Sequence, residues 1–277
     1  MTTAQEPKLT WNLRGRSPED IPVKADGQHV TPEWAWGAGT GAGVRVCVVD
    51  SGVERHHPLV GPIAGSHVVV KDEDGIRVEP TEARDVCGHG TACAGIIRRV
   101  APNCELHSVR VLGERFSGTG EFLLAGLRWA VEQRFDIINL SLSTTRARFT
   151  DTLHRLADDA YFDGTAIIAS AHNTAVESYP WRFSSVISVA SHQERAQDLL
   201  LYNPQPPVEF FAPGQNITVA WTGGTSIRSS GNSFATPFVA GLCARILAEH
   251  PELAVFQLKN ILYLLSSNVT ISSGDSA

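Results

Sequence analysis

Four side chains of this 277-residue sequence have the types needed for attack on a carbonyl carbon, and each stands where a strand or helix is expected to begin or end. Asp50 directly follows the β-branched run Val-Arg-Val-Cys-Val-Val, and His89 stands between two glycines. Asn173 follows a second apolar run, and Ser233 precedes a long apolar helix. A carboxylate and an imidazole can together activate a hydroxyl as a nucleophile, and a nearby amide can stabilise the resulting oxyanion.

Each of these residues also has an interpretation that involves no chemistry. Asp50 can form a turn with the Ser-Gly that follows it, and Asn173 can do the same after its strand. Ser233 can cap the helix behind it, which is the commoner role of a serine there. His89 can be an ordinary loop histidine, although a helix N-terminus favours the neutral imidazole that suits a general base. Only their occurrence together, in the chain order Asp, His, Ser, favours the chemical interpretation.

The elements that must position these residues alternate between strands and helices. Apolar runs typical of buried strands are followed by segments of helical spacing along most of the chain. This alternation predicts an α/β fold, a three-layer α/β/α sandwich with a mostly parallel central sheet, in which chemistry gathers at the carboxyl ends of the strands. The expected strands are 44–50, 105–112, 136–142, 165–171, 185–191 and 208–214, and the expected helices are 91–100, 120–135, 149–164, 234–248 and 254–265.

The chain divides into three regions by composition. Residues 1–30 are polar, with proline and mixed charge, and are predicted to form an N-terminal arm. Thr31 followed by Pro32 predicts the capped start of a helical turn. Residues 31–268 contain no repeat and no linker and are predicted to be one domain that carries all four candidate residues, while residues 269–277 are predicted to be a flexible C-terminal tail.

The bulk composition excludes several classes of function. A formal net charge of −6 and a sequence pI of about 5.9 do not provide the basic surface of a nucleic-acid binder. No apolar run is long enough to span a bilayer, and the polar N-terminus lacks the apolar core of a secretion signal. The five cysteines are odd in number and none has C-x-x-C spacing. Reduced thiols in the cytoplasm, with no metal site and no cofactor, are therefore expected.

Three blocks of the sequence resemble the signature blocks of the subtilisin-like serine proteases. They are Val-Val-Asp-Ser-Gly around Asp50, Gly-His-Gly-Thr around His89 and Gly-Asn-Ser-Phe-Ala-Thr-Pro around Ser233, and they follow the family's chain order. Four further blocks between them match as well, so the resemblance extends from about residue 34 to about residue 267. It implies the subtilisin-like fold and serine endopeptidase activity.

The resemblance implies a role for each matching residue. Ser233 would be the nucleophile, His89 the general base and then the general acid, and Asp50 the residue that orients the imidazole. Asn173 and the backbone N–H of Ser233 would bind the oxyanion. A peptide or protein substrate would bind in extended form between two backbone segments, with neither nucleic acid nor membrane as a partner. The residues expected to contact it are Ser117, Gly118, Thr119, Ser141, Leu142, Ser143, Ser170, Ala171, His172 and Asn232.

Three positions depart from the family pattern around the expected pocket. His172 stands where the family has glycine, Asn232 where it has threonine and Ser143 where it has glycine. These changes predict a narrower or more polar pocket, with Glu177 near it. The calcium-binding insertion of the secreted members is missing after the His89 helix, and only a short segment stands where those members carry a signal and a pro-domain. The expectation is an intracellular processing protease with a restricted substrate.

Two other functions stay open at this point. The same scaffold can trim a leader from a precursor peptide or transfer the acyl group to an amine, and no residue distinguishes transfer from hydrolysis. A pseudo-protease that binds peptides without cutting them is disfavoured by the intact Asp50, His89, Ser233 and Asn173. Only His172 keeps that reading open.

Overall fold

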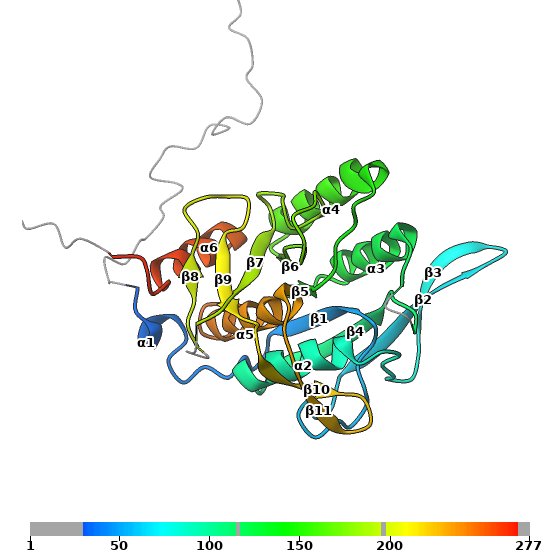
Figure 1. Ribbon diagram of the computed structural model, residues 1–277, viewed down its shortest axis with the longest axis horizontal. Helices are drawn as coiled ribbons and strands as arrows, with labels where there is room; N and C mark the ends of the chain where they lie inside the picture. Colours follow the sequence, from blue (N-terminus) through cyan, green and yellow to red (C-terminus); the bar gives the residue numbers. More distant parts are fainter. Residues whose placement is uncertain (1–29, 115–116, 195–197, 271–277) are drawn as a thin grey trace, which may run out of the picture.

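Nine strands pair into one sheet in the computed structural model, which describes residues 30–114, 117–194 and 198–270 (Figure 1). Their spatial order is β3-β2-β4-β1-β5-β6-β7-β9-β8, and the neighbours from β2 to β9 pair in parallel. The edge strands β3 and β8 pair antiparallel to their neighbours. The strands are β1 (Arg45–Asp50), β2 (Gly65–Asp72), β3 (Gly75–Pro80), β4 (Glu105–Arg110), β5 (Ile137–Leu140), β6 (Ala166–Ser170), β7 (Ile187–His192), β8 (Leu201–Tyr202) and β9 (Phe210–Pro213).

Helices cover both faces of the sheet, which confirms the predicted three-layer α/β/α sandwich (Figure 1). α3 (Gly120–Glu132) and α4 (Thr150–Phe162) pack on one face. α2 (His89–Val100), α5 (Asn232–Glu249) and α6 (Val255–Leu264) pack on the other. The two hydrophobic cores therefore lie on either side of the sheet.

Four short elements complete the described chain. α1 (Pro32–Ala35) is the predicted helical turn, and Thr31 caps it by accepting a hydrogen bond from the Trp34 backbone N–H at 3.2 Å. The 3-10 turn η2 (Ala147–Phe149) precedes α4, and the hairpin of β10 (Ile217–Trp221) and β11 (Thr225–Ser229) packs against α2. Among the helices of this part of the chain, none combines the length and apolarity needed to span a membrane.

Strand β1 shows how the alternation of a strand directs a functional side chain. Val46 and Val48 belong to the core under α2 and α5, whereas Cys47 and Val49 belong to the core under α3 and α4. Successive side chains of a strand point to opposite faces. Asp50 therefore points to the same face as Val46 and Val48, which is the face that carries α2.

The end of β1 is also the point at which the sheet changes direction. β1 pairs with β4 on one side and with β5 on the other, and the remaining strands extend outward from these two. Parallel sheets leave a crevice for ligands at such a switch point, beyond the carboxyl ends of the strands. Asp50, the last residue of β1, lies at this crevice.

The two helices beneath the crevice pack unusually close together. A Cβ atom at Gly241 of α5 would lie 2.6 Å from the Cβ of Val100 and 3.4 Å from the carbonyl oxygen of Ile97. Only glycine permits this approach between α5 and α2. The contact fixes the position of α5, which carries Ser233, relative to α2, which begins with His89.

The sequence patterns predict most of this architecture but miss two hairpins. β2 contains the short apolar run of residues 68–70 but lies near the sheet edge with mostly half-buried residues, and β3 has no buried residue. β10 and β11 lie outside the main sheet, and β11 is mostly exposed. α2 begins at His89 rather than at residue 91, and α5 begins at Asn232 rather than at residue 234. The predicted arm and tail fall mostly on residues 1–29 and 271–277, which lie outside the described residues.

Candidate active site

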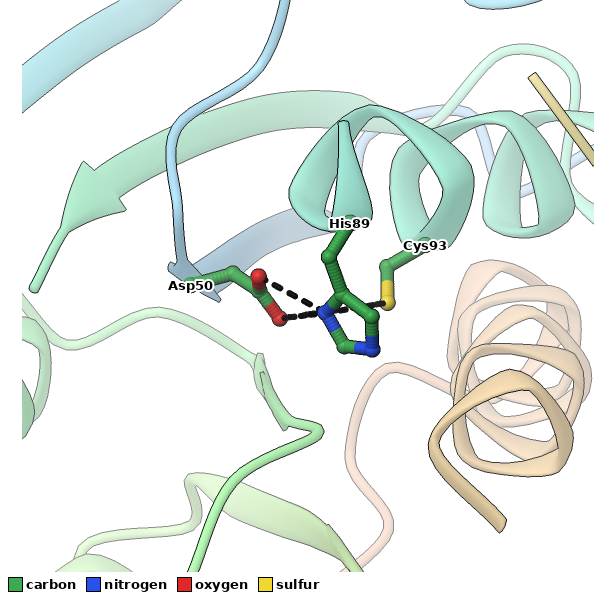
Figure 2. Close-up of side chains that lie close together, drawn as sticks. All are labelled: Asp50, His89 and Cys93. Atoms are coloured by element: carbon green, nitrogen blue, oxygen red, sulfur yellow. Dashed lines mark hydrogen bonds and ion pairs between the residues drawn. The ribbon is translucent and has the colours of Figure 1, made fainter. Parts of the chain in front are cut away.

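A buried ion pair between Asp50 and His89 forms the centre of the site. The Nδ1 atom of His89 lies 2.8 Å from Oδ1 and 2.9 Å from Oδ2 of Asp50. Figure 2 shows the carboxylate at the end of β1 reaching the imidazole in the first turn of α2, with the second ring nitrogen directed away from it. The backbone N–H of Ser51 also donates to Asp50 Oδ1 at 2.7 Å. This pairing puts a proton on Nδ1 of His89 and orients the ring.

Glycines on both sides of His89 allow the backbone to deliver its ring to Asp50. Gly88 has a φ of +93°, and a Cβ atom there would lie 2.5 Å from the Trp221 ring. A Cβ atom at Gly90 would lie 2.0 Å from the carbonyl oxygen of Gly52. Gly88 is therefore required by conformation and by close approach, and Gly90 by close approach alone.

A second buried carboxylate, Asp85, holds the start of α2. Its Oδ1 accepts hydrogen bonds from the backbone N–H groups of Cys87 and Gly88 at 3.0 and 2.8 Å. Its Oδ2 accepts from the N–H and the hydroxyl of Thr91 at 2.8 and 2.6 Å. The hydroxyl of Ser51 donates to Oδ1 at 2.8 Å, which links this cap to the residue after Asp50. Asp85 thus satisfies donors that the helix itself leaves unpaired.

Asp85 is a positioning residue that the sequence interpretation overlooks. It lies four residues before His89 and close to the start of α2, where a carboxylate is favoured by the helix dipole. An acidic residue just before a helix start is a recognisable signal. The signal is weak by itself because Val-Cys-Gly separates Asp85 from the helix, so the acid does not stand at the usual capping position.

Two opposing effects set the protonation of His89. Burial of the ring acts to lower the pKa of His89, while the Asp50 carboxylate raises it, and the pKa lies well above its ordinary value. The opposite charge at hydrogen-bond distance favours the imidazolium form. A proton taken up by His89 is therefore stabilised at this position.

Cys93 packs beneath the imidazole one helical turn after His89. Its Sγ atom lies 3.9 Å from Asp50 Oδ2 and 4.0 Å from His89 Nδ1 (Figure 2). Burial raises the pKa of the Cys93 thiol. Asp50, His89 and Cys93 together place three potential metal-ligand atoms within 4.8 Å of one another. The direct hydrogen bonds between Asp50 and Nδ1 account for this clustering as part of an acid–imidazole pair.

Ser233 is the second residue of α5, in its first turn, and it does not cap the helix. Gly231 occupies the capping position, so the interpretation of Ser233 as a helix cap is wrong. The ring of Phe234, the next residue, lies 5.4 Å from the ring of His89, centroid to centroid. The first turn of a helix presents backbone N–H groups without helical acceptors. Ser233 therefore stands at a helix N-terminus that favours negative charge, and the ring of the residue after it packs beside the imidazole.

A proline inside α5 frees the carbonyl group of Ser233. Pro237 has no N–H to donate to the carbonyl four residues earlier. Ser141, just after β5, donates its hydroxyl to the Ser233 carbonyl oxygen at 2.8 Å, and the Cys93 thiol lies 3.6 Å from the same oxygen. Asn139 donates to the Ser141 hydroxyl at 3.2 Å. The missing helical bond is thus replaced by bonds that fix Ser233 to the sheet and to α2.

Asn232, the residue before Ser233, is hydrogen-bonded to Asn173. The backbone N–H of Asn232 donates to Oδ1 of Asn173 at 3.0 Å, which orients the exposed Asn173 amide so that its NH₂ group is turned away from this bond. The Asn232 side chain accepts from the N–H and hydroxyl of Ser191, both at 2.9 Å. It also donates to the carbonyl oxygens of Ala171 and His172 at 3.3 and 3.2 Å.

These bonds give the Asn232 side chain a structural role. Its side-chain amide uses its donors and acceptor within the protein and so holds the segment before Asn173, while the expected contact of Asn232 with substrate stays a prediction. The side chain of Ser141 is likewise buried and used by Ser233. Ser170 and Ala171, at and after the end of β6, are buried as well. Asn232, which stands where the family has threonine, thus stabilises the backbone around the nucleophile.

The remaining predicted substrate residues lie at the surface of the crevice. Ser117, Gly118 and Thr119 are exposed, and Thr119 also caps α3. Leu142 and Ser143 are half-buried beyond the end of β5. These residues form the two backbone segments between which the resemblance places an extended peptide.

His172 adopts a defined position. Its Nδ1 accepts a hydrogen bond from the Thr174 backbone N–H at 3.1 Å, and its half-buried ring lines a cavity beside Ser143. His172 is therefore one of the residues that line a polar cavity in the region expected to hold substrate. Glu177 is not among the residues that line that cavity, and its carboxylate lies 3.7 Å from Arg182.

The comparison with known proteins agrees with this geometry. Residues 41–270 match the sequence profile of the subtilase family. The chain belongs to the subtilase family. This subtilase is 33% identical over 262 residues to the minor extracellular protease Epr of Bacillus subtilis (strain 168), a match that covers 90% of this chain and 37% of Epr. It is 29% identical to subtilisin DY of Bacillus licheniformis, with 83% and 85% of the two chains covered.

Solved structures give the same result for the fold. The subtilase superposes on a cold adapted subtilisin-like serine proteinase with a TM-score of 0.64 at 29% sequence identity, covering 80% of this chain and 81% of that chain. The lengths of its relatives differ widely. The subtilase spans 37% of the length of Epr and 61% of that of the thermostable alkaline protease of Halalkalibacterium halodurans.

The cap formed by Asp85 gives a stability prediction. In an Asp85→Asn variant of this subtilase, the NH₂ group cannot accept the hydrogen bonds that Cys87, Gly88 or Thr91 now donate. We expect the free energy of unfolding, measured by urea denaturation, to fall by about 2 kcal/mol. The matched control is Asp74→Asn in the exposed turn between β2 and β3, which should change it by less than about 0.5 kcal/mol. Equal effects of the two substitutions would contradict the assignment.

The pair of Asp50 and His89 gives a titration prediction. In the folded protein the His89 ring should remain protonated well above pH ~6.5, the unfolded value. Because the folded pKa is raised, the pair stabilises the fold fully below the unfolded pKa, and this stabilisation is lost as the pH rises through the folded pKa. Asp50→Asn removes the counter-charge but not the burial, so the pKa of His89 should drop.

The measurement is an NMR titration of the His89 imidazole in both proteins. Glu105→Gln removes a different carboxylate, which lies beside His107 on the same sheet, and serves as the control. It should leave the titration of His89 unchanged. An unaltered pKa of His89 in the Asp50→Asn variant would show that Asp50 does not set it.

Proposed function

We propose that this subtilase is a serine endopeptidase that cleaves peptide bonds through an acyl-enzyme formed on Ser233. One observation carries the proposal: a completely buried Asp50 carboxylate holds Nδ1 of His89, next to the helix N-terminus that contains Ser233. A serine hydroxyl becomes an effective nucleophile only when a base removes its proton during attack. The membership of the chain in the subtilase family supports the same chemistry.

Each residue then has a defined task in the reaction. With Nδ1 of His89 donating to Asp50, Nε2 is the atom that takes the proton as Ser233 Oγ attacks the scissile carbonyl carbon. The oxyanion accepts hydrogen bonds from the Asn173 amide and from the Ser233 backbone N–H, and losing one such donor costs about 10²–10³ in turnover. His89 returns the proton to the leaving amine as the C–N bond breaks. Water then attacks the acyl-enzyme by the same route and releases the acid.

The raised pKa of His89 determines the direction of the pH dependence. Only the unprotonated imidazole can accept the serine proton, and the Asp50 carboxylate keeps the ring protonated to a higher pH than usual. The rate of acylation should therefore increase towards alkaline pH. The charge of Asp50 also stabilises the imidazolium that forms in the transition state, which is where the interaction contributes to the rate.

A processing role with a restricted substrate is the finer part of this proposal. The polar cavity beside Ser143 and His172 supports selectivity for a particular side chain. Water or an amine can act as the acceptor of the acyl group, since both attack the same ester carbonyl. The mass of the product separates these outcomes, because a transferred amine remains attached to the acyl fragment.

A fluorophosphonate probe tests the catalytic assignment. The probe reacts covalently with a serine that is activated by a neighbouring base, so wild-type protein should be labelled and Ser233→Ala should not. Ser226→Ala, in the exposed strand β11, is the matched control and should be labelled like wild type. Absence of labelling in folded wild-type protein would favour a peptide-binding pseudo-protease.

We propose in addition that the protein works in a reducing compartment, the cytoplasm. All five cysteines are free, and Cys47, Cys93, Cys104 and Cys243 are buried. An odd number of unpaired thiols supports a reducing environment. The relative Epr is named an extracellular protease, which favours a location outside the cell instead.

Fractionation of the source cells decides between these locations. Detection of the native chain with a specific antibody should place it in the cytoplasmic fraction together with a cytoplasmic marker enzyme. Recovery from the culture medium or from the cell envelope would overturn this part of the proposal and leave the catalytic assignment untouched.

A further inference from the structure

A large polar cavity opens directly beside the residues assigned to the oxyanion. Its volume is about 790 Å³, and its walls come from residues 118–121, residues 143–149 and His172. His172 immediately precedes Asn173, and residues 118–119 and 143 belong to the two segments expected to hold substrate. The cavity is therefore continuous with the place where a substrate peptide would lie. Its size is sufficient for one long side chain with bound water.

The charges on the cavity wall are mainly positive. Arg146 and Arg148 both line it, and the one carboxylate among its lining residues is that of Glu121. Glu121 is already paired with Arg148, at 2.7 Å. Within the residues that the structure describes, Arg146 has no carboxylate within ion-pair distance and is exposed. The chain as a whole has a net charge of −6, so the cavity wall is positively charged on a protein whose net charge is negative.

The wall that carries the arginines is held in place by its backbone. The N–H and carbonyl groups of Thr144 pair with the carbonyl and N–H groups of Tyr179 at 2.9 and 3.0 Å. The backbone N–H of Arg146 donates to the Thr144 hydroxyl at 3.2 Å. The base is closed by Phe149, whose ring would lie 1.9 Å from a Cβ atom at Gly120. Arg146 is thus attached to an ordered segment at the mouth of the cavity.

A second cavity, which is also lined by Gly118 and Thr119, has the same sign of charge. It has a volume of about 400 Å³, and Arg110 is its only charged lining residue in the described chain. The Nε atom of Arg110 is buried without a hydrogen-bond partner in that part of the structure. Both cavities that flank this segment therefore offer guanidinium donors, which match carboxylate acceptors in charge and geometry.

We propose that the subtilase selects peptides that carry a glutamate or aspartate on the acyl side of the scissile bond, with the acidic side chain bound to Arg146 in the larger cavity. The inference rests on the proposed endopeptidase function and names its substrate class. The acyl side follows from the geometry of the reaction. His89 passes its proton to the leaving amine, so the leaving group lies beside His89, whereas the cavity is lined by His172, the residue directly before the oxyanion-binding Asn173.

Paired peptides test this selectivity. The two peptides of a pair are identical except at one of the four positions before the cleaved bond, where one has glutamate and the other has glutamine. The side-chain shape is thereby retained and only the charge changes. At one position the glutamate peptide should have a kcat/KM higher by about tenfold, the size expected of a charge-assisted hydrogen bond to an arginine. The ratio should fall as the salt concentration is raised, because an exposed guanidinium is screened.

Two variants assign the effect to Arg146. Arg146→Gln should bring the ratio of kcat/KM for glutamate over glutamine close to one, and Arg146→Glu should invert it. Arg155→Glu changes the net charge equally from the exposed face of α4, in a different cavity, and is the matched control that should keep the wild-type ratio. A ratio near one at all four positions in wild type, or an unchanged ratio in Arg146→Glu, would overturn the inference.

The same samples separate this failure from failure of the proposed function. Wild type and all three arginine variants are first labelled with the fluorophosphonate probe. Labelling and peptide cleavage without acidic preference would reject only the selectivity for acidic side chains. Absence of both labelling and cleavage in folded wild type would reject the endopeptidase function, and the inference with it.

Discussion

The buried carboxylate of Asp50 is the group on which the arrangement of this site depends. A charge removed from water costs several kcal/mol unless it is paired and hydrogen-bonded. Asp50 is completely buried, and its partners are the His89 imidazole and the Ser51 backbone N–H. Every element nearby serves this pairing. β1 directs Asp50 to one face, Gly88 and Gly90 allow α2 to start there, and α5 packs against α2 through a glycine contact.

The two buried acids, Asp50 and Asp85, have different roles in the site. Asp85 receives its hydrogen bonds from backbone N–H groups and hydroxyls of the helix start, so it fixes the position of α2 without contacting His89. Asp50 is then free to interact with the imidazole and to set its pKa. Ser51 connects the two, since its N–H donates to one carboxylate and its hydroxyl to the other. This separation lets the ring be oriented by charge while the backbone is held by the cap.

The start of α5 follows the same principle of replacing regular helical bonds by bonds to other elements. Pro237 removes the helical partner of the Ser233 carbonyl, and Ser141 takes its place. Asn232 uses its side chain to hold the segment before Asn173 and its N–H to orient the Asn173 amide. Ser233 is thereby fixed to both sides of the crevice. Beyond this hydrogen-bonded centre, the two cavities that share Gly118 and Thr119 carry arginines, although the chain as a whole is acidic.

The sequence by itself determined the class of fold and the identity of the four central residues. Runs of β-branched residues and helical spacing reflect burial that any parallel sheet requires, and the blocks around Asp50, His89 and Ser233 are local in the chain. The tertiary structure alone decided which polar groups meet across the chain. Asp85 as a cap, Ser141 as partner of the Ser233 carbonyl, and the engaged amide of Asn232 all depend on hydrogen bonds between distant segments. So does the grouping of Arg146 with His172, because a cavity and its charge arise only when separate loops close around the same space.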